Sequence, residues 1–589
     1  MRKTNIVLIV MAVLLISFTY WTFLGFTIFK KVVHKEEFRK CINVLSSKYE
    51  NIKYSDNQRE DDPFITAYQN LYDVQNYKLK LSFDIPKKYL FGNLEMKALN
   101  ISDTLNKIYI NLNNDMKINF VKLNDAEVKF DHKQNYIIIT TNNSKDKIKN
   151  SNEFKVEIGY EGSPKNTGFD SFGFKTFDNE PAIYTLSEPE NAPTWWPCKD
   201  IISDKSTSEL IITVPSQLTA VSNGLLQEVK DEENGDKTFY WKNNYPITTY
   251  LISIAIGKYD TWSDKYISLD STKQMPVDYY TYPSFTENAK IDWKNTVKMI
   301  EFFSKTFGEY PFIKEKYGMA LFGWVGGAME HQTVSSMGYT LITGNGKYEN
   351  IVVHELAHQW FGDAVSPESW KDIWLNEGFA TYSEALWEEN TKGKEAYINS
   401  LKKNDNGYFG GTLYNPEGFI FNSTVYNKGA WCLHMLRGTV GDSVFFKILK
   451  TYYEKYKYKN ANTYDFQKVC EEVSGTDLKY FFEQWIFTGR GRPEYRYSWK
   501  SEDFQDQNAT GVYTLRVNLR QIQEDYEVYK MPVRITIKTE SGIEEQKFFN
   551  DSKTQQFEFP VNGKPIEVLI DNDNWILKKI QKEEYKNTY

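Results

Sequence analysis

Cysteine is scarce in this sequence, with only 4 residues in a chain of 589. The four positions are far apart, and no two of them form a CxxC pair: Cys41, Cys198, Cys432 and Cys470. This spacing excludes a zinc site built on paired thiolates and the dense disulfide framework of small secreted domains. The spacing does not exclude a single isolated disulfide.

An excess of positive charge is also missing. The formal net charge is -7 and the pI is near 5.7, and no stripe of lysine and arginine stands out. Nucleic acid is therefore not expected as a partner. Apolar residues, in contrast, are plentiful: 41% of the chain is hydrophobic and 16% is aromatic, enough for large packed cores. At about 150 residues per domain, the length predicts three or four domains.

The N-terminus carries the one long uncharged run. Residues 6–29 contain no charged side chain, and a helix of that length spans the roughly 30 Å hydrocarbon core of a bilayer. The far end of the run is bulky and aromatic, unlike a signal-peptidase cleavage site. We predict an uncleaved, single-pass transmembrane anchor over residues 1–30 and a charged juxtamembrane stalk over residues 31–70.

The flanking charges leave the membrane orientation open. Arg2 and Lys3 precede the run, whereas Lys30, Lys31 and Lys35 follow it. The larger positive charge on the trailing side would keep the rest of the chain in the cytoplasm. A short basic head before the first apolar run is instead typical of a signal anchor. We expect the part after the anchor to be extracytoplasmic.

Hydrophobic periodicity divides the remainder into three parts. Over residues 71–262 apolar and polar residues alternate, as at Tyr77, Leu79 and Leu81, which predicts an antiparallel β domain. Over residues 263–490 helical spacing dominates, with a predicted helix from Trp293 to a stop at Gly308 and another helix capped by Asp442. Alternation returns over residues 491–589 and predicts a β-sandwich. The expected fold class is multidomain α+β.

The most informative motif is His354-Glu355-Leu356-Ala357-His358. The chain has 6 histidines, and two of them occur here at positions i and i+4, which share one face of a helix. Glu377 is close enough in sequence to arrive on a second helix as a third ligand. Three protein ligands and one open position are typical of a catalytic zinc. The glutamate between the histidines is suited to act on a bound water.

This motif with Glu377 resembles the gluzincin metallopeptidases, and three further segments resemble one branch of them, the aminopeptidase N and leukotriene-hydrolase family. The segments are Gly327-Ala328-Met329-Glu330-His331, Tyr426-Asn427-Lys428-Gly429-Ala430, and Thr185-Leu186-Ser187-Glu188 followed by Trp195-Trp196-Pro197-Cys198-Lys199-Asp200. The likeness covers about residues 70–490. It implies a thermolysin-like, mainly helical catalytic domain between the two β domains.

The resemblance also implies roles. His354, His358 and Glu377 would bind one Zn²⁺ per chain, and Glu355 would be the general base. Tyr426 would donate a hydrogen bond to the oxyanion, and Glu384, two turns after Glu377, would orient a ligand histidine.

Glu330 and Glu188 would form a clamp for the free α-amine of a peptide. Gly326, Gly327 and Ala328 would let the backbone approach a substrate strand closely, and Met329 and His331 belong to the same expected substrate-binding segment. Two positions depart from the family pattern. His331 replaces an asparagine and could change the pH dependence, since histidine titrates near neutrality. Leu186 replaces a glutamine and would favour apolar first residues.

The expected function is a membrane-anchored zinc aminopeptidase acting on peptides with a free N-terminus. Three alternatives stay open: a zinc endopeptidase, an epoxide hydrolase acting on a lipid, and a non-catalytic peptide-binding membrane protein on the same frame. The clamp residues disfavour the first, no residue points to the second, and the intact ligands and base disfavour the third. The sequence does not indicate an oligomeric state.

Overall fold

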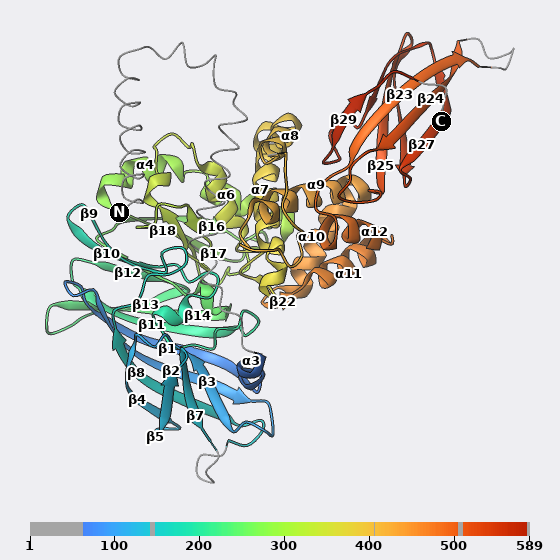
Figure 1. The fold of residues 1–589 in the computed structure, drawn as a ribbon. Helices are drawn as coiled ribbons and strands as arrows, with labels where there is room; N and C mark the ends of the chain where they lie inside the picture. The colour runs from blue at the N-terminus through green and yellow to red at the C-terminus, as the bar shows by residue number, and fades with distance from the viewer. Residues whose placement is uncertain (1–62, 142–147, 406, 505–510, 586–589) are drawn as a thin grey trace, which may run out of the picture. The chain divides into compact units, whose positions relative to one another are not determined.

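A computed structural model describes residues 63–141, 148–405, 407–504 and 511–585 (Figure 1). The predicted transmembrane anchor over residues 1–30, and the predicted stalk up to residue 62, lie outside this described part. Among the described residues, no helix is both long and apolar enough to cross a bilayer. The described cysteines Cys198, Cys432 and Cys470 are buried, and Cys432 and Cys470 form no disulfide with a described residue.

The N-terminal part is built on three sheets, preceded by helix α3 (Pro63–Gln69). The largest has eight strands in the order β13 (Leu225–Asp231), β14 (Asp236–Ile247), β11 (Ser206–Pro215), β1 (Tyr72–Asp84), β2 (Tyr89–Asn100), β8 (Glu153–Gly162), β4 (Lys117–Leu123) and β5 (Ala126–Glu127). The second sheet has four strands in the order β12 (Thr219–Ser222), β15 (Ile254–Gly257), β10 (Glu180–Thr185) and β9 (Phe172–Phe177). The third sheet has three strands in the order β3 (Lys107–Asn111), β7 (Tyr136–Thr140) and β6 (Phe130–Lys133).

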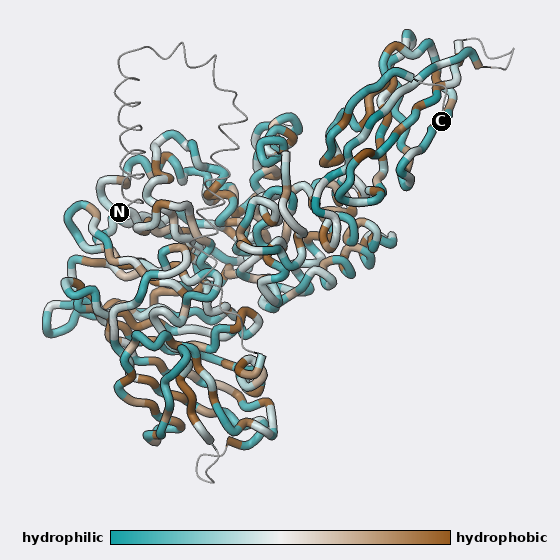
Figure 2. Tube along the Cα trace, viewed as in Figure 1, coloured by the Kyte–Doolittle hydropathy of each residue, from teal (hydrophilic) through white to brown (hydrophobic). Residues whose placement is uncertain are grey.

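Side-chain alternation explains how these strands pack. Tyr77, Leu79 and Leu81 on β1 are buried, and β1 pairs with β2 in the antiparallel register Leu79 opposite Leu94. Alternating apolar residues on one face of a sheet form a core, as predicted. One pair differs from the prediction of a purely antiparallel domain, because β1 pairs with β11 in parallel. In Figure 2 the hydrophobic segments follow the strands, and most of the turns are hydrophilic.

The middle part begins with a mixed five-stranded sheet in the order β16 (Asp260–Ile267), β17 (Gln274–Thr281), β18 (Tyr317–Phe322), β20 (Ser335–Gly338) and β19 (Ala328–Met329). Strand β16 starts at Asp260, slightly before the domain boundary expected at residue 263. Helices then dominate: α4 (Thr286–Asp292), α5 (Thr296–Phe307), α6 (Glu349–Ala357), α7 (Trp374–Lys392), α8 (Lys394–Lys403), α9 (Gly429–Val440), α10 (Asp442–Tyr456), α11 (Thr463–Ser474) and α12 (Lys479–Phe482). Two π-helical turns, η7 (Thr424–Lys428) and η8 (Glu483–Phe487), and the pair β21 (Val365–Pro367) and β22 (Lys459–Ala461) complete it.

Two predicted helix starts were wrong. Trp293 belongs to the end of α4 rather than to α5, and α5 runs from Thr296 to the predicted stop at Gly308. Asp442 is the first residue of α10 and not its cap. Its carboxylate instead accepts hydrogen bonds from the Arg437 guanidinium, one of them at 2.8 Å, so a tertiary ion pair replaces the expected local bond.

The C-terminal part consists of two sheets. One is β27 (Thr554–Asn562), β24 (Val512–Gln521), β23 (Glu494–Asp503) and β29 (Lys579–Lys582), and the other is β26 (Gly542–Asn550), β25 (Met531–Thr539) and β28 (Pro565–Ile570). Alternate residues of both sheets, such as Val517 and Ile535, belong to one hydrophobic core. Two sheets that share a core in this way form a sandwich. The multidomain α+β fold class is therefore confirmed.

Candidate active site and metal centre

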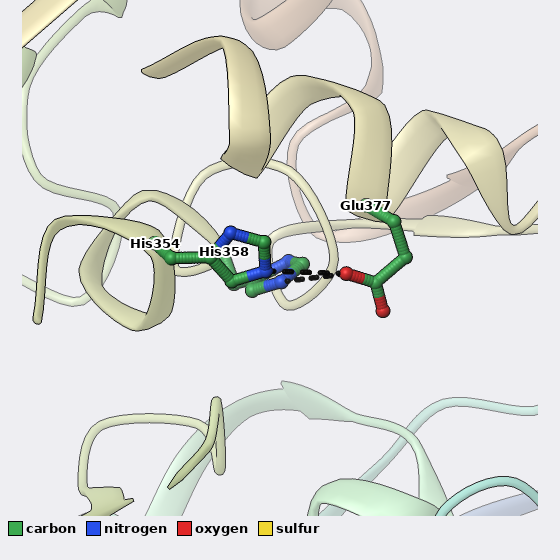
Figure 3. Close-up of side chains that lie close together, drawn as sticks. All are labelled: His354, His358 and Glu377. Atoms are coloured by element: carbon green, nitrogen blue, oxygen red, sulfur yellow. Dashed lines mark hydrogen bonds and ion pairs between the residues drawn. The ribbon is translucent and has the colours of Figure 1, made fainter. Parts of the chain in front are cut away.

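Three ligand atoms converge where α6 meets α7. His354 lies in the last turn of α6, His358 follows the end of that helix, and Glu377 lies in the first turn of α7. The Nε2 atoms of His354 and His358 lie 3.2 and 3.5 Å from the same Glu377 oxygen (Figure 3). Ligand atoms of all three residues lie within 4.8 Å of one another, and all three side chains are buried. Two imidazole nitrogens and one carboxylate oxygen facing a single point match the donor set of catalytic zinc sites.

The ionised state of Glu377 also suits a cation. Burial alone would raise the pKa of Glu377, but hydrogen bonds to His354 and His358 outweigh burial and lower it to about 2. The carboxylate therefore stays ionised over the physiological range of pH.

Each ligand histidine is oriented through its other ring nitrogen. His354 Nδ1 lies 2.9 Å from an oxygen of Glu384, and His358 Nδ1 lies 3.0 Å from the carbonyl oxygen of Phe361. With the Nδ1–H group donating a hydrogen bond to these oxygens, each Nε2 keeps its lone pair for a metal. Asn350, one turn before His354 on α6, donates to the second oxygen of Glu384 at 3.0 Å. Asn350 was not predicted, although its spacing from His354 places it on the same face of the helix.

Two further groups line the same cavity as the His354, His358 and Glu377 trio. Glu355 is only 6% exposed, and burial together with the negative charge of Glu330 raises its pKa to about 8, against the opposing charge of the two histidines. Tyr426 lies on the π-helical turn η7, and its ring stacks on His354 with centroids 6.0 Å apart. Burial and the nearby carboxylates raise the pKa of Tyr426 well above 10. The phenol therefore stays a neutral hydrogen-bond donor.

Glu330 and Glu188 come from different elements and meet in the same cavity. Glu330 follows β19, and Glu188 lies three residues beyond β10. They are 3% and 6% exposed, and the Oε1 atom of each makes no hydrogen bond with the described residues. Burial raises the pKa of both, and the Glu330 charge raises that of Glu188 further. A buried carboxylate oxygen without a partner is costly, and a cation placed between the two carboxylates would offset that cost.

A cavity of about 440 Å³ brings most of the predicted residues together. Its lining includes His354, His358, Glu377, Glu355, Tyr426, Glu384, Glu188, Leu186, Glu330, Gly327, Ala328 and Met329. Four aromatic side chains from distant loops complete the wall and were not predicted: Phe169, Trp324, Phe419 and Phe421. The centroid of the Phe169 ring lies 6.0 Å from the centroid of the Trp324 ring and 5.4 Å from that of the Phe421 ring. No local pattern marks them, because their proximity depends on the tertiary fold.

His331 lies elsewhere than expected. It does not line the cavity, and its Nδ1 lies 2.8 Å from the Ser336 hydroxyl on β20. Neighbouring residues of an extended chain point to opposite sides, so Glu330 faces the cavity and His331 faces away from it. Complete burial lowers the pKa of His331 to about 3. The expectation that this histidine titrates near neutrality is therefore corrected.

Two contacts fix the site to its scaffold. The Gln359 amide donates to the Glu330 carbonyl oxygen at 3.1 Å and accepts from the Thr333 N–H at 2.9 Å, which links the end of α6 to the segment between β19 and β20. Gly378 follows the ligand Glu377, and a Cβ at this position would lie 2.9 Å from the Cα of Gly429. The backbones of α7 and α9 therefore touch directly beside the turn that carries Tyr426.

Family models match both of the larger parts of the chain. The peptidase M1 N-terminal domain matches residues 73–251, and the peptidase family M1 domain matches residues 291–408 and 415–485. The chain belongs to the peptidase M1 family. The resemblance seen in the sequence is thereby confirmed.

Two relatives in which the match covers half of this chain or more are named aminopeptidases. The chain is 28% identical over 441 residues to a probable aminopeptidase 2 of Sulfurisphaera tokodaii, covering 70% of this chain and 53% of that one. It is 30% identical over 325 residues to aminopeptidase M1-A of Oryza sativa subsp. japonica, covering 51% and 36%. The chain thus spans about half of the first relative's length and about a third of the second's.

Solved structures show the same fold. Aminopeptidase A of Legionella pneumophila, in complex with aspartic acid, superposes with a TM-score of 0.74 at 17% identity, covering 88% of this chain and 60% of that one. An M1 zinc metallopeptidase variant of Deinococcus radiodurans, bound to a Tyr-Ser-Ala substrate, gives 0.63 at 26% identity, covering 71% and 94%.

Proposed function

We propose that this protein is a zinc-dependent aminopeptidase that removes the first residue from peptides with a free N-terminus. The observation that carries the proposal is the pair of buried, unpartnered oxygens of Glu188 and Glu330 in the cavity that also holds the His354, His358 and Glu377 trio. A protonated α-amine placed between the two carboxylates would satisfy both by charge-assisted hydrogen bonds. The aminopeptidase names of the M1 relatives support the same activity.

The metal would be held by His354, His358 and Glu377. When bound, zinc supplies Lewis-acid chemistry, since it polarises a carbonyl and lowers the pKa of water to about 7. The other roles belong to residues of the chain. The Glu355 carboxylate would take a proton from the attacking water and pass it to the leaving amine. The Tyr426 hydroxyl would donate a hydrogen bond to the carbonyl oxygen as negative charge develops there.

An endopeptidase is the principal alternative. An internal peptide segment carries no ammonium group, so it would bury the Glu188 and Glu330 oxygens without a cation. Leaving a buried carboxylate unpaired costs several kcal/mol, which is enough to make such a segment a very poor substrate. The clamp therefore favours removal of single residues from the end. A non-catalytic peptide binder would need neither Glu355 nor Tyr426, both of which line the cavity.

One peptide in two forms tests the proposal. The full chain is incubated with a peptide that has a free N-terminus and with its acetylated form, with and without a zinc chelator, and the products are read by mass spectrometry. We expect stepwise, chelator-sensitive loss of residues from the free form alone. Internal cuts in both forms would support the endopeptidase. No cleavage of either form by the zinc-loaded protein would support the peptide binder.

Membrane attachment is a separate proposal. We propose that residues 6–29, which carry no charge, hold the protein in a bilayer as a single helix with the catalytic part outside the cytoplasm. The full chain should resist extraction from membranes by alkaline carbonate and require detergent. Protease added to intact cells should degrade the catalytic part, and complete protection in intact cells combined with cleavage after lysis would reverse the orientation.

A further inference from the structure

Four aromatic rings line the active-site cavity together: Phe169, Trp324, Phe419 and Phe421, which we call the aromatic wall. Phe169 is at its centre, and its ring centroid lies 6.0, 5.7 and 5.4 Å from those of the other three in that order. All three pairs are edge-to-face, an arrangement that aromatic rings prefer over a face-to-face sandwich. These mutual contacts hold the four rings in place relative to one another.

The loop that carries Phe169 is joined directly to Glu188. The Thr167 hydroxyl donates to the side-chain oxygen of Asn191 at 2.8 Å, and the Asn191 amide donates to the backbone carbonyl of Glu188 at 3.0 Å. Leu186, two residues before Glu188, lines the same cavity. One carboxylate of the proposed amine clamp and the apolar side chains beside it therefore belong to one hydrogen-bonded unit.

Trp324 lies close in the chain to the other carboxylate of the clamp, Glu330. Its indole packs on the backbone of Gly326, where an added Cβ would lie 2.3 Å from the ring. A larger residue at this position would displace the indole, so glycine permits the close approach. Gly326, Ala328 and Met329 line the cavity together with Trp324. The two chain segments that supply the clamp therefore also supply part of the aromatic wall.

The charged side chains of the cavity disfavour an acidic first residue. Among the described residues no lysine or arginine lines the cavity, whereas five glutamates do: Glu188, Glu330, Glu355, Glu377 and Glu384. A carboxylate on the first residue would be repelled and would find no cationic partner. In the proposed function the glutamates are engaged by the α-amine, the metal, the attacking water and His354. A basic side chain would therefore lose its hydration against rings that offer only a cation–π contact.

We propose that the aromatic wall receives the side chain of the first residue and that the protein prefers peptides that begin with phenylalanine, tyrosine or tryptophan. This inference rests on the proposed aminopeptidase function. The α-amine and the side chain of the first residue share one Cα, so an amine held by Glu188 and Glu330 places that side chain beside Leu186 and Trp324. A ring inserted there buries about 150–250 Å² and adds edge-to-face contacts.

Five tripeptides test the wall with the full, zinc-loaded chain: Phe-Ala-Ala, Ala-Ala-Ala, Ala-Phe-Ala, Glu-Ala-Ala and Arg-Ala-Ala. Initial rates of release of the first residue, followed by mass spectrometry, give kcat/KM. We expect the value for Phe-Ala-Ala to exceed that for Ala-Ala-Ala by about 10- to 100-fold, the usual gain from burying one large apolar side chain. Glu-Ala-Ala should be the poorest substrate. Ala-Phe-Ala should stay close to Ala-Ala-Ala, because its ring lies beyond the scissile bond.

Two variants should change this preference in different ways. Phe169→Leu removes the central ring but keeps an apolar side chain, so the Phe-Ala-Ala to Ala-Ala-Ala ratio should fall about two- to tenfold. Phe419→Arg adds a cation, so the Glu-Ala-Ala to Phe-Ala-Ala ratio should rise by about tenfold or more. The control is Phe549→Leu, on a phenylalanine of β26 that is 44% exposed and does not line the cavity. It should keep the wild-type ratios. Zinc content and the circular dichroism spectrum report on folding.

Equal kcat/KM values for Phe-Ala-Ala and Ala-Ala-Ala in the wild type would overturn the proposal, even where a variant does not fold. A gain with Ala-Phe-Ala instead would assign the wall to the second residue, and the highest value with Arg-Ala-Ala would make it a site for cations. Unchanged ratios in both folded variants would also contradict it. Hydrolysis of none of the five tripeptides by the zinc-loaded wild type would overturn the aminopeptidase function instead.

Discussion

The Nδ1 atom of His354 and a carboxylate oxygen of Glu384 lie 2.9 Å apart, on the side of the imidazole ring opposite the metal position. Glu384 lies two turns after Glu377 on α7, so one helix carries both carboxylates that contact the His354 ring, one at each nitrogen. A histidine held by a carboxylate in this way keeps its tautomer and becomes a better base towards the metal.

Replacing Glu384 should therefore weaken zinc binding. We expect Glu384→Ala to lower the zinc affinity by about 10- to 100-fold, since the loss of a group that orients a ligand typically has this effect. Competition with a chromogenic chelator measures the affinity. Glu388→Gln, one turn later on α7 and paired with Lys392 rather than with a ligand, is the matched control. Equal affinities in Glu384→Ala and wild type would contradict an orienting role.

Glu355→Gln should separate metal binding from chemistry. The amide has nearly the shape of the carboxylate but does not accept a proton, so we expect kcat to fall by about 10²- to 10⁴-fold while the zinc content stays at one ion per chain. Steady-state kinetics and metal analysis of the same preparation provide both values. Activity close to the wild type would exclude Glu355 as the general base.

Glu330→Ala should measure how much the proposed Glu188 and Glu330 clamp contributes to binding the α-amine of a peptide. Truncating one partner of a buried charge pair costs about 2–5 kcal/mol, so kcat/KM for a free-amine peptide should fall by at least about 30-fold, chiefly through KM. The zinc affinity should change much less, because Glu330 is not a ligand. If the variant and the wild type bind an amino-terminal amine inhibitor equally well, Glu330 does not recognise the amine.

Lys428 predicts a pH-dependent term in stability. Its side chain is fully buried and donates to the Gly489 carbonyl oxygen at 2.5 Å, and burial lowers its pKa from 10.5 to about 8. Below pH 8 the lysine is protonated in both folded and unfolded states, and the cost of burying the charge is complete. Between pH 8 and 10.5 only the unfolded state holds the proton, so stability rises with pH in this window.

The comparison with Lys428→Met isolates that term. The free energy of unfolding of wild type, relative to the variant, should increase by up to about 3 kcal/mol between pH 8 and 10.5, at about 1.36 kcal/mol per pH unit. Thermal unfolding followed by calorimetry across this range measures the relative midpoints. A difference independent of pH would show that Lys428 keeps its ordinary pKa in the folded protein.

Regular patterns made most of the fold predictable from the sequence. Strand β1 follows from the alternation at Tyr77, Leu79 and Leu81, because each of these side chains faces a core on one side of a sheet. The parallel pairing of β1 with β11 was not predictable in this way, since alternation reports which face is buried and not which strand lies alongside. Asp442 was misread for a related reason: its partner Arg437 comes from the preceding helix α9.

The candidate site also contains residues that a local sequence pattern predicted and residues that depend on the tertiary fold. Two histidines one turn apart indicate a shared ligand direction, so the sequence alone was enough to propose the metal trio. Phe169 and Phe421 are far apart in the chain and meet only because of the tertiary fold. The direction of His331 depends on the exact start of the short strand β19, whose two residues give no periodicity to analyse.

The contact between Gly378 and Gly429 has a consequence for any redesign of this enzyme frame. Because no side chain separates α7 from α9 at this contact, the distance between the two helices cannot be tuned there by substituting a smaller or larger side chain. Even one added methyl group would wedge α7 away from α9 and carry Glu377 away from Tyr426. The spacing between Glu377 and Tyr426 is thus set by two backbones in direct contact, with no side chain between them that could be changed to adjust it.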